Sequence, residues 1–330
     1  MNKLNILVTG GAGFIGSHLC DQLLDCGHKV IAVDNLINGK TRNIESAKSN
    51  ENFSFVQEDI LNAHRMIELT KGIDVIYHLA CLGVRHSIHS PRENHLVNAE
   101  GTLNMLEAAR TNHVKHFYYI STSEIYGDVQ TFPINEQAVP LPKTVYGSSK
   151  LAGENYTYSY FKCYQLPVTI LRIFNNYGPR AHYEGDAGEI IPRSIVNMIY
   201  GKNPIIFGDG NVTRDFFFVK DTAKVLSDLL NKKNLEGEII NVGTGEEITM
   251  KNLMEKLIIL LNNGSSIEYL DDRPADVPRL WVDNTKFKSI TGFNSSVTFE
   301  QGLLETINYY KELTIKNNLI SEIKTFNWTK

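Results

Sequence analysis

Residues 9–16 read Thr-Gly-Gly-Ala-Gly-Phe-Ile-Gly and directly follow a short apolar run. The spacing Gly-x-x-Gly-x-x-Gly is typical of the turn between the first strand and first helix of a dinucleotide-binding fold. The first glycine permits a tight bend, the second lets the backbone approach a pyrophosphate, and the third brings the helix close to the strand. The helix N-terminus then faces the phosphates with its free N–H groups and its dipole. The expected contacts in this loop are Gly10, Gly13, Phe14, Ile15 and Gly16.

A carboxylate closes the second expected strand at Asp34, about 20 residues beyond the glycine loop. It can accept hydrogen bonds from the adenosine ribose hydroxyls and would repel a 2'-phosphate, so we predict NAD rather than NADP as cofactor. After the third strand, Asp59 either bonds the adenine amino group or caps the helix that follows, and the sequence leaves both roles open. The remaining expected dinucleotide contacts are Asn35, Ile60, Leu79 and Ala80.

Short β-branched apolar runs alternate with longer segments of helical period along the first 175 residues. This alternation is typical of repeated βαβ units. We therefore predict an α/β fold, a Rossmann doubly wound parallel sheet. The expected strands are Leu4–Thr9, Lys29–Val33, Phe53–Gln57, Val75–Leu79, His116–Ser121 and Val168–Arg172, and the long expected helices are Pro91–Thr111 and Tyr146–Tyr164.

Beyond residue 175 the alternation of strand and helix patterns ends, and loops rich in glycine and proline follow. A helix over Asp221–Leu230 and a strand over Ile239–Val242 are expected to return to the sheet, which predicts a smaller, discontinuous α/β substrate-binding cap. Segment 182–189 is expected to cover a bound nucleotide. The predicted division is 1–175 with about 215–245 for the NAD-binding domain, 176–214 with 246–315 for the substrate-binding cap, and 316–330 for a peripheral or partly ordered tail.

Composition excludes several classes of function. With 33 basic and 37 acidic residues the net charge is −4, and no long run of one sign suggests binding to nucleic acid or a membrane. The four cysteines, at positions 20, 26, 81 and 163, form no Cys-x-x-Cys pair, and no histidine cluster has metal-ligand spacing. We expect reduced thiols and no metal. The chain has no recognisable targeting signal and no apolar run of about 18 residues, so we expect a cytoplasmic protein.

Tyr146 and Lys150 stand at positions i and i+4 of an expected helix, and therefore on one face. A cation beside a phenol favours the phenolate and lowers its pKa from about 10. Such a phenolate can take a proton from a sugar hydroxyl while a nicotinamide takes the hydride. Lys150 can also reach the nicotinamide ribose. Combined with the glycine loop, the pair predicts dehydrogenase-type chemistry.

At this point the chain resembles the extended short-chain dehydrogenase/reductase family, specifically its nucleotide-sugar epimerases, dehydratases and decarboxylases. The resemblance covers nearly the whole chain. It rests on the glycine loop, Asp34, Tyr77-His78-Leu79-Ala80, Ser121-Thr122-Ser123-Glu124-Ile125-Tyr126-Gly127, Tyr146 to Lys150, Arg172-Ile173-Phe174-Asn175 and Tyr177-Gly178-Pro179-Arg180. These motifs are specific for the family and much less so for the reaction.

The resemblance also implies substrate contacts. Thr122 would bond the 4-hydroxyl of the sugar, and Asn175 would touch the diphosphate. Guanidinium groups suit bidentate phosphate recognition, which agrees with the arginines that the resemblance selects. The full set of expected substrate contacts is Arg85, Asn175, Ile191, Phe207, Arg214, Arg273 and Asp276.

Glu124 bears on which reaction follows oxidation of C4. A ketone at C4 acidifies the C5 hydrogen, and a carboxylate there can remove that proton and deliver one to the departing 6-hydroxyl. This favours a 4,6-dehydratase acting on a UDP-sugar such as UDP-GlcNAc. One dehydratase branch carries an Asp where Ser123 stands, so Ser123 joins Thr122, Glu124, Tyr146 and Lys150 as a candidate catalytic residue.

Three alternatives remain open. Cys81-Leu82-Gly83-Val84-Arg85-His86-Ser87 looks more like the corresponding loop of 4-epimerases, which favours a UDP-sugar 4-epimerase. The Thr-Ser-Glu motif also occurs in UDP-glucuronate decarboxylases. A dinucleotide-binding regulatory protein without turnover is the non-enzymatic alternative. The resemblance further implies a homodimer built on helices 91–111 and 146–164.

Overall fold

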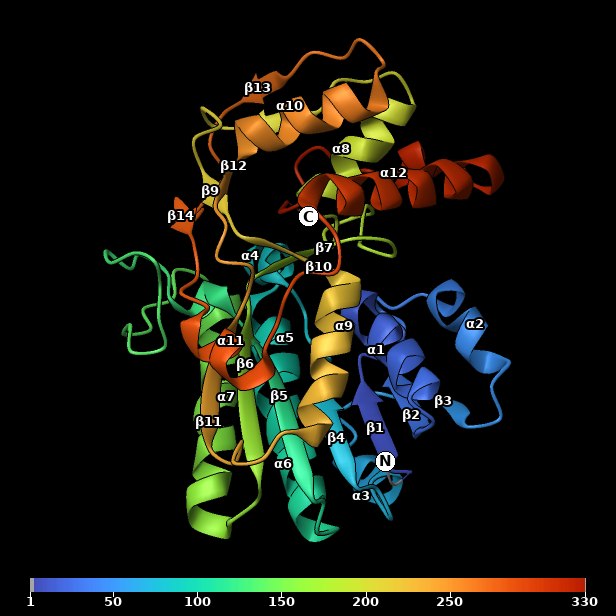
Figure 1. Ribbon diagram of the computed structural model, residues 1–330, viewed down its shortest axis with the longest axis vertical. Helices are drawn as coiled ribbons and strands as arrows, with labels where there is room; N and C mark the ends of the chain where they lie inside the picture. Colours follow the sequence, from blue (N-terminus) through green and yellow to red (C-terminus); the bar gives the residue numbers. More distant parts are fainter. Residues whose placement is uncertain (1–2, 330) are drawn as a thin grey trace.

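A seven-stranded parallel sheet forms the centre of the computed structural model, which describes residues 3–329 (Figure 1). The strand order is β11-β6-β5-β4-β1-β2-β3, so the winding direction reverses between β1 and β4. Ligands of such sheets bind outside the carboxyl ends of the strands at this reversal. The strands are β1 (Asn5–Thr9), β2 (Lys29–Asp34), β3 (Phe53–Gln57), β4 (Val75–His78), β5 (His116–Thr122), β6 (Val168–Ile173) and β11 (Glu238–Val242).

All seven predicted strands are present, with ends that differ from the prediction by no more than one residue. Most of their residues are buried, and β6 is buried at every position, as expected for a parallel sheet covered on both faces. The predicted Rossmann fold is confirmed, including the return of the chain to the sheet through α9 (Val219–Asp228) and β11.

Helices cover both faces of the sheet. One layer consists of α1 (Phe14–Asp25), α9 and α11 (Thr285–Thr291), and α1 packs directly against α9. The other layer consists of α3 (Ala63–Leu69), α4 (Val84–His89), α5 (Pro91–His95), α6 (Gly101–Thr111) and α7 (Val145–Tyr164). Short helical turns complete this half of the chain: η1 (Thr41–Ile44), α2 (Glu45–Lys48), η2 (Leu96–Glu100), η3 (Ser123–Ile125) and η4 (Leu229–Asn231).

The helix predicted over 91–111 is interrupted by η2, a π-helical turn between α5 and α6. The wider turn holds Asn98, which is fully buried. Its Oδ1 accepts from the amide of Leu82 at 2.8 Å, and its Nδ2 donates to the carbonyl of the same residue at 2.9 Å. The turn thereby fixes the loop that follows β4, which lies at the carboxyl edge of the sheet.

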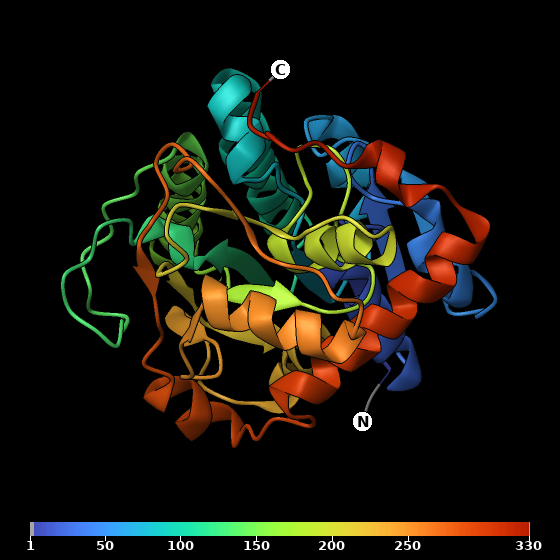
Figure 2. The ribbon, with the colours of Figure 1, turned by 90° about the horizontal axis from the view of Figure 1, so that it is seen from above.

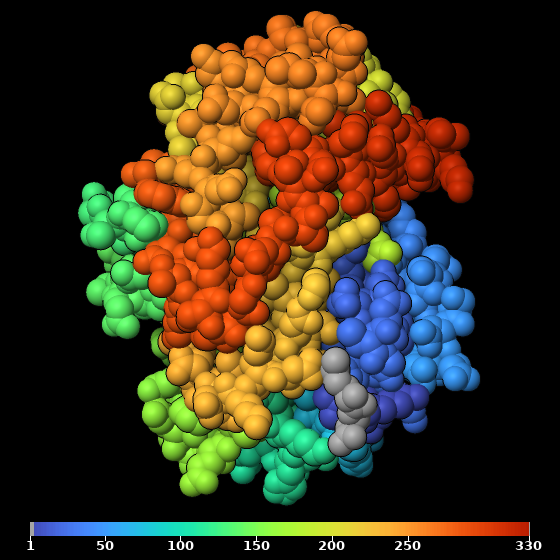
Figure 3. Space-filling model, in the orientation of Figure 1, coloured from blue at the N-terminus to red at the C-terminus, as the bar shows by residue number. Residues whose placement is uncertain are grey.

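The cap lies above that edge (Figures 1 and 2). Its helices are α8 (Ile190–Ile199), α10 (Met250–Leu261) and α12 (Phe299–Lys316), which share one hydrophobic core. Three small sheets accompany these helices. They are formed by β7 (Asn175–Tyr177) with β10 (Phe216–Phe218), by β9 (Thr213–Arg214) with β12 (Ile248–Thr249) and β14 (Arg279–Leu280), and by β8 (Ile205–Phe207) with β13 (Glu268–Leu270). In the space-filling view the orange and red cap packs over the blue and green sheet domain (Figure 3).

The segment after α12 differs from the predicted peripheral tail. A short helical turn, η5 (Leu319–Glu322), buries Leu319 completely, and Asn327 is only 1% exposed. Arg193 of α8 donates hydrogen bonds from Nη2 to the carbonyls of Lys324 and Thr325, at 2.7 and 2.9 Å. The polar composition suggested a solvated tail. In the structure, the buried side chains of Leu319 and Asn327 and the hydrogen bonds from Arg193 hold this segment on the cap. Lys330 lies outside the described residues.

All four cysteines are free thiols in the structure, as predicted. Within residues 3–329 no helix combines the length and the apolar character that crossing a membrane requires.

Candidate active site

The glycine loop has the geometry that a pyrophosphate site requires. Gly10 adopts φ +69°, a left-handed conformation that suits glycine, and its amide donates to the carbonyl of Val33 at 2.8 Å. A Cβ at Gly16 would lie 2.1 Å from the carbonyl oxygen of Gly10, so only glycine lets α1 approach the loop this closely. Gly13 occupies the N-cap of α1 and has no side chain that could cap the helix, so backbone N–H groups of the first turn stay available to an anion.

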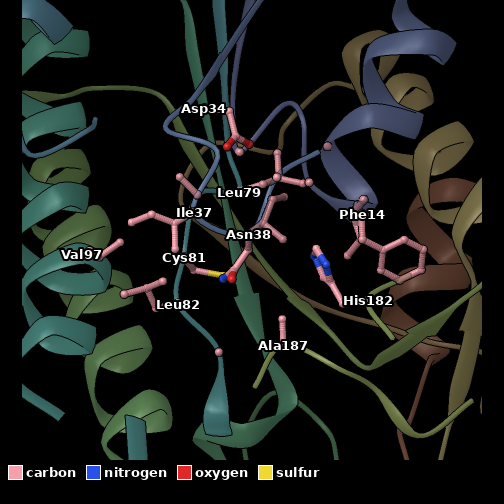
Figure 4. Close-up of a pocket in the computed structure, with 18 of the residues that line it drawn as sticks. Phe14, Asp34, Ile37, Asn38, Leu79, Cys81, Leu82, Val97, His182 and Ala187 are labelled. Carbon is pink, nitrogen blue, oxygen red and sulfur yellow. The ribbon is translucent and has the colours of Figure 1, made fainter. Parts of the chain in front are cut away.

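The loop opens into a first cavity, the cofactor cavity, which Figure 4 shows. Asp34 and Ala187 lie toward opposite ends of it in this view, with Cys81 and Asn38 between them. The predicted dinucleotide contacts that line this cavity are Gly10, Gly13, Phe14, Ile15, Gly16, Asp34, Asn35, Ile60, Leu79, Ala80 and Tyr146. Residues that follow four neighbouring strands, together with Tyr146 of α7, thus surround one space.

Asp34 ends β2 and is 8% exposed. Its Oδ2 accepts from the amide of Ala12 at 3.0 Å, and its Oδ1 accepts from the amide of Leu36 at 2.8 Å. Burial raises the pKa of this carboxyl, while the two amide hydrogen bonds act in the opposite direction. The carboxylate is therefore oriented by the backbone at the end of the cavity where an adenosine ribose is expected.

Asp59 does not cap the helix that follows, and its contact with the adenine amino group stays a prediction. Its Oδ2 accepts from Nδ2 of Asn35 at 2.9 Å, and its Oδ1 accepts from the amide of Leu61 at 2.8 Å. The N-cap of α3 is Asn62, whose side chain accepts from the amide of Arg65. Asp59 therefore positions Asn35, which does line the cavity.

Tyr146 lies in the first turn of α7, which Thr144 caps by accepting from the amide of Gly147 at 3.1 Å. Burial raises the pKa of Tyr146 well above its ordinary value, and Cys81 acts in the same direction; a hydrogen bond with Thr122 lowers it. Lys150, 2% exposed, donates from Nζ to the carbonyl of Ile120 at 2.7 Å and lies outside the residues that line either cavity described here. Burial therefore outweighs the groups that lower the pKa of Tyr146, and the expected contribution of Lys150 to lowering it stays a prediction.

A short helical turn after β5 presents the other candidate catalytic groups. Thr122 is the N-cap of this turn, and its hydroxyl accepts from the amide of Glu124 at 3.2 Å. The first turn of α7 packs against it so closely that a Cβ at Gly147 would lie 2.7 Å from the carbonyl oxygen of Glu124. Thr122, Glu124 and Tyr146 consequently line one cavity. Ser123 is 3% exposed and lines neither cavity, so its placement gives no support to a catalytic role.

The second cavity, the substrate cavity, adjoins the first, since Arg85, Thr122 and Tyr146 line both. Every predicted substrate contact lines it: Arg85, Asn175, Ile191, Phe207, Arg214, Arg273 and Asp276. Residues from the sheet edge, from α8, from β8 and from the segment before β14 meet there.

The charges of the substrate cavity suit a diphosphate. Asp276 accepts through Oδ1 from Nη2 of Arg214, at 2.7 Å, and from Nη2 of Arg273, so one carboxylate orients two guanidinium groups. Burial and the nearby charge of Arg273 lower the pKa of Arg85 to about 10. The buried Oδ1 of Asn175 has no hydrogen-bond partner within the described part of the chain. A buried polar atom without a partner is costly, which is consistent with the prediction that Asn175 contacts the substrate.

Sequence reasoning missed several residues of the site. Arg193 and Asn197 of α8 and the C-terminal pair Asn327 and Trp328 line the substrate cavity. The arginine lies only two residues after the predicted contact Ile191, and positions i and i+2 do not share a helix face, so the sequence pattern gave no signal for it. No local signal marks Asn327 or Trp328, because they reach the cavity only through the packing of the C-terminal segment on the cap.

Segment 182–189, which is expected to cover a bound nucleotide, lies beside both cavities. Arg85 donates from Nε to the carbonyl of Asp186 at 2.9 Å and from Nη2 to the carbonyl of Ala187 at 3.0 Å. His182, Asp186, Ala187 and Glu189 line the cofactor cavity. The segment therefore covers the junction of the two cavities.

His86, His89 and Asp186 gather beside this segment, with their potential ligand atoms within 4.8 Å of one another. The expectation that histidines do not cluster at ligand spacing is wrong at this point, because α4 and a segment distant in sequence meet. His89 Nε2 and Asp186 Oδ2 form a hydrogen bond at 2.9 Å, and His86 Nε2 lies 3.2 Å from Glu93. These contacts link α4 to the covering segment.

Comparison with known proteins decides the family. The sequence model for the family described as GDP-mannose 4,6 dehydratase matches residues 7–306. The chain belongs to the NAD-dependent nucleotide-sugar epimerases and dehydratases. Its cofactor is NAD, since solved relatives of the family contain it and the residues of the cofactor cavity fit it.

Its relatives carry out different reactions. The chain is 37% identical to a putative UDP-glucose 4-epimerase of Methanocaldococcus jannaschii, over 93% of this chain and 98% of that protein. It is 35% identical to a UDP-N-acetyl-alpha-D-glucosaminuronate decarboxylase of Bacillus cytotoxicus, over 94% and 99%. The crystal structure of UDP-glucuronic acid 4-epimerase from Bacillus cereus, in complex with UDP-glucuronic acid and NAD, matches with a TM-score of 0.89 at 34% identity, over 94% of this chain and 100% of that chain. The comparisons therefore establish the family and leave the reaction open.

Proposed function

We propose that the protein is an NAD-dependent nucleotide-sugar 4,6-dehydratase acting on a UDP-sugar such as UDP-GlcNAc. The observation that carries this proposal is the placement of Glu124. Its carboxylate lies in the same cavity as Tyr146 and Thr122 and has no hydrogen-bond or ion-pair partner among residues 3–329. A 4-epimerase returns the hydride to C4 and needs no second acid–base group, whereas elimination of water across C5 and C6 needs one.

The residues divide the chemistry as follows. Thr122 orients the 4-hydroxyl and Tyr146 takes its proton, while bound NAD supplies the hydride acceptor for C4 and a positive charge that favours the phenolate. Glu124 then removes the C5 proton and protonates the departing 6-hydroxyl. Return of the hydride to C6 and of a proton to C5 gives the 4-keto-6-deoxy sugar, so the overall reaction consumes no oxidant. Lys150, which donates to the carbonyl of Ile120 at the end of β5, supplies the ammonium group that favours the Tyr146 phenolate and can also reach the nicotinamide ribose.

A 4-epimerase is the second candidate, because the relatives from M. jannaschii and B. cereus carry that name. Mass spectrometry after incubation with UDP-GlcNAc, UDP-glucose, UDP-glucuronate and GDP-mannose separates the reactions. Loss of water supports the dehydratase, loss of carbon dioxide indicates a decarboxylase, and unchanged mass with an altered NMR spectrum indicates an epimerase.

Variants test the role of Glu124 separately. We expect Glu124→Gln to lower kcat by about 10²- to 10⁴-fold, with NAD binding unchanged. Glu255→Gln, an equivalent change on the exposed face of α10, is the matched control and is expected to leave the rate unchanged. A fully active Glu124→Gln enzyme contradicts the assignment. Tyr146→Phe should abolish the first oxidation in all three reactions.

We also propose that the enzyme is a cytoplasmic homodimer. Large apolar side chains stay exposed on the helices expected to pair, among them Leu96, Tyr156, Tyr158 and Tyr164. Sedimentation equilibrium measures the oligomeric state directly, and a monomer at micromolar concentration contradicts this proposal.

A further inference from the structure

Two histidines of α4 and one aspartate of the covering segment 182–189 form a cluster beside the cofactor cavity. His86 and His89 stand at positions i and i+3 of α4, so they share one face of the helix. One nitrogen of each ring and one carboxylate oxygen of Asp186 lie within 4.8 Å of one another, and the three side chains are between 14% and 29% exposed. Two imidazoles and a carboxylate are a donor set typical of Zn²⁺.

The two segments that carry these donors are held together by the main chain. Arg85, which directly precedes His86, donates from Nε to the carbonyl of Asp186 at 2.9 Å and from Nη2 to the carbonyl of Ala187 at 3.0 Å. These bonds do not depend on the charge of either histidine. The donors are therefore brought to short range before an ion binds, which reduces the ordering cost of binding it.

The surroundings of His86 suit a metal ligand. Its Nε2 lies 3.2 Å from Oε2 of Glu93, whereas its buried Nδ1 has no hydrogen-bond partner within residues 3–329. When Nε2–H donates to the carboxylate, Nδ1 carries the free lone pair. Metal-binding histidines commonly have this arrangement, in which a carboxylate fixes the tautomer of the ring.

His89 has an equivalent partner for its second nitrogen. Its Nδ1 lies 2.9 Å from Oγ of Ser90, and its Nε2 lies 2.9 Å from Oδ2 of Asp186. With Nδ1–H donating to the hydroxyl oxygen, Nε2 becomes a ligand beside the carboxylate. A proton on His89 would also account for its contact with Asp186, but it would leave Nδ1 of His86 unpaired.

The charges of the cluster favour a cation. Asp186 and Glu93 bring two negative charges and Arg85 brings one positive charge, so the group is negative when both histidines are neutral. Spacing along the sequence does not show this group, because Asp186 lies 97 residues after His89. The cluster forms only when α4 packs against the covering segment.

We propose that His86, His89 and Asp186 form a binding site for a divalent transition-metal ion, with Zn²⁺ the ion that fits this donor set best. Water completes the coordination. The ion fastens α4 to the covering segment. Ala187, the residue after Asp186, lines the cofactor cavity (Figure 4), so the ion stabilises one wall of that cavity.

Calorimetric titration of the NAD-loaded enzyme with Zn²⁺, after removal of any purification tag, tests the site. We expect one Zn²⁺ per chain with a Kd tighter than about 100 µM. Loss of a supporting partner of a metal ligand weakens binding by about 10- to 100-fold, so Glu93→Gln should cost about tenfold. His89→Gln removes a ligand itself and should cost at least about 100-fold. Mg²⁺ should not bind, because it prefers oxygen ligands.

His64→Gln is the matched control, since this histidine of α3 has a side chain that is 85% exposed, and it should leave the Zn²⁺ affinity unchanged. Glu93 has a side chain that is 57% exposed, so Glu93→Gln gives a readout even where His89→Gln impairs folding. A Kd weaker than about 100 µM, equal Zn²⁺ affinities of the wild type and His89→Gln, or tighter binding of Mg²⁺ than of Zn²⁺ would each overturn the proposal.

Hydrogen exchange of the amides in segment 182–189 tests whether the ion fastens it. If opening of the segment breaks the site, free Zn²⁺ at about 100 times its Kd should slow this exchange by up to about 100-fold. The effect should be absent in His89→Gln, and unchanged exchange in saturated wild-type enzyme would show that the segment is not fastened. None of these measurements uses a sugar substrate, so their outcome does not depend on which reaction the enzyme catalyses.

Discussion

The buried ion pair between Glu154 of α7 and Arg172 of β6 offers the sharpest test of how the site is supported. The two side chains are 3% and 5% exposed, and Arg172 donates to the carboxylate from Nε at 3.1 and 3.2 Å and from Nη2 at 2.8 Å. Nη1 of Arg172 donates to the hydroxyl oxygen of Tyr126 at 2.8 Å, and that hydroxyl donates to Oδ1 of Asn241 at 2.7 Å. Tyr126 directly follows η3, the turn that carries Glu124. The ion pair between Glu154 and Arg172 therefore supports this turn through the hydrogen bond to Tyr126.

Glu154→Gln leaves the guanidinium charge buried and turns one acceptor into a donor that faces Arg172. Removing one partner of a buried pair costs about 3–5 kcal/mol. With an unfolding entropy of about 2 cal/mol/K per residue, a chain of this length should lose about 6 °C in Tm. Urea unfolding followed by circular dichroism measures the change in the free energy of unfolding, and differential scanning calorimetry measures the Tm.

Two controls make the result specific. Glu107→Gln removes the carboxylate of an exposed pair with Arg110 and should have little effect. The double variant Glu154→Leu/Arg172→Met removes both buried charges and should be less destabilised than Glu154→Gln, because an apolar pair leaves no charge unpaired. A loss below about 1 kcal/mol in Glu154→Gln, or a double variant less stable than the single one, would refute the reasoning.

Three further predictions concern the cofactor and pH. Gly16→Ala places a Cβ 2.1 Å from the carbonyl oxygen of Gly10, so the loop must open by about 1 Å. We expect the affinity for NAD, measured by calorimetric titration, to fall about tenfold or more. An unchanged affinity would contradict the assignment of the loop. Asp34→Asn removes the charge that opposes a 2'-phosphate, so the preference for NAD over NADP should shrink by about tenfold. If the wild-type enzyme binds NADP as tightly as NAD, the role assigned to Asp34 is wrong. Burial lowers the pKa of His116 from 6.5 to about 4. Between about pH 6.5 and 4 the unfolded chain therefore binds a proton at this histidine that the folded chain does not bind, so the free energy of unfolding decreases as the pH falls through this range. His116→Gln should reduce that decrease by up to about 3 kcal/mol, measured by denaturation series at several pH values.

Local patterns in the sequence determined the sheet and the two most specific motifs. Strand positions follow from short β-branched runs, and the glycine loop follows from a spacing that one backbone conformation requires. The position of Tyr146 in the first turn of a helix follows from its spacing to Lys150 and from the capping residue Thr144 before it. These signals depend on neighbours close in sequence, so they can be read without the fold.

The tertiary structure decided what each side chain touches. Lys150 donates to the backbone carbonyl of Ile120, and Asp59 accepts from the side chain of Asn35. The π-helical turn at Leu96–Glu100 interrupts a segment whose periodicity predicted one helix. In each case a partner distant in sequence outweighs the local tendency, because burial makes an unpaired charge or amide costly.

The C-terminal segment illustrates the same division. Its composition predicted a solvated tail, yet Asn327 is buried and donates a hydrogen bond to Gly188. In the sequence Gly188 precedes α8, whereas Asn327 follows α12. Nothing within a few residues of Asn327 specifies that contact. The family can therefore be recognised from motifs along the chain, whereas the lining of the substrate cavity forms only when distant segments pack together and satisfy one another's hydrogen bonds.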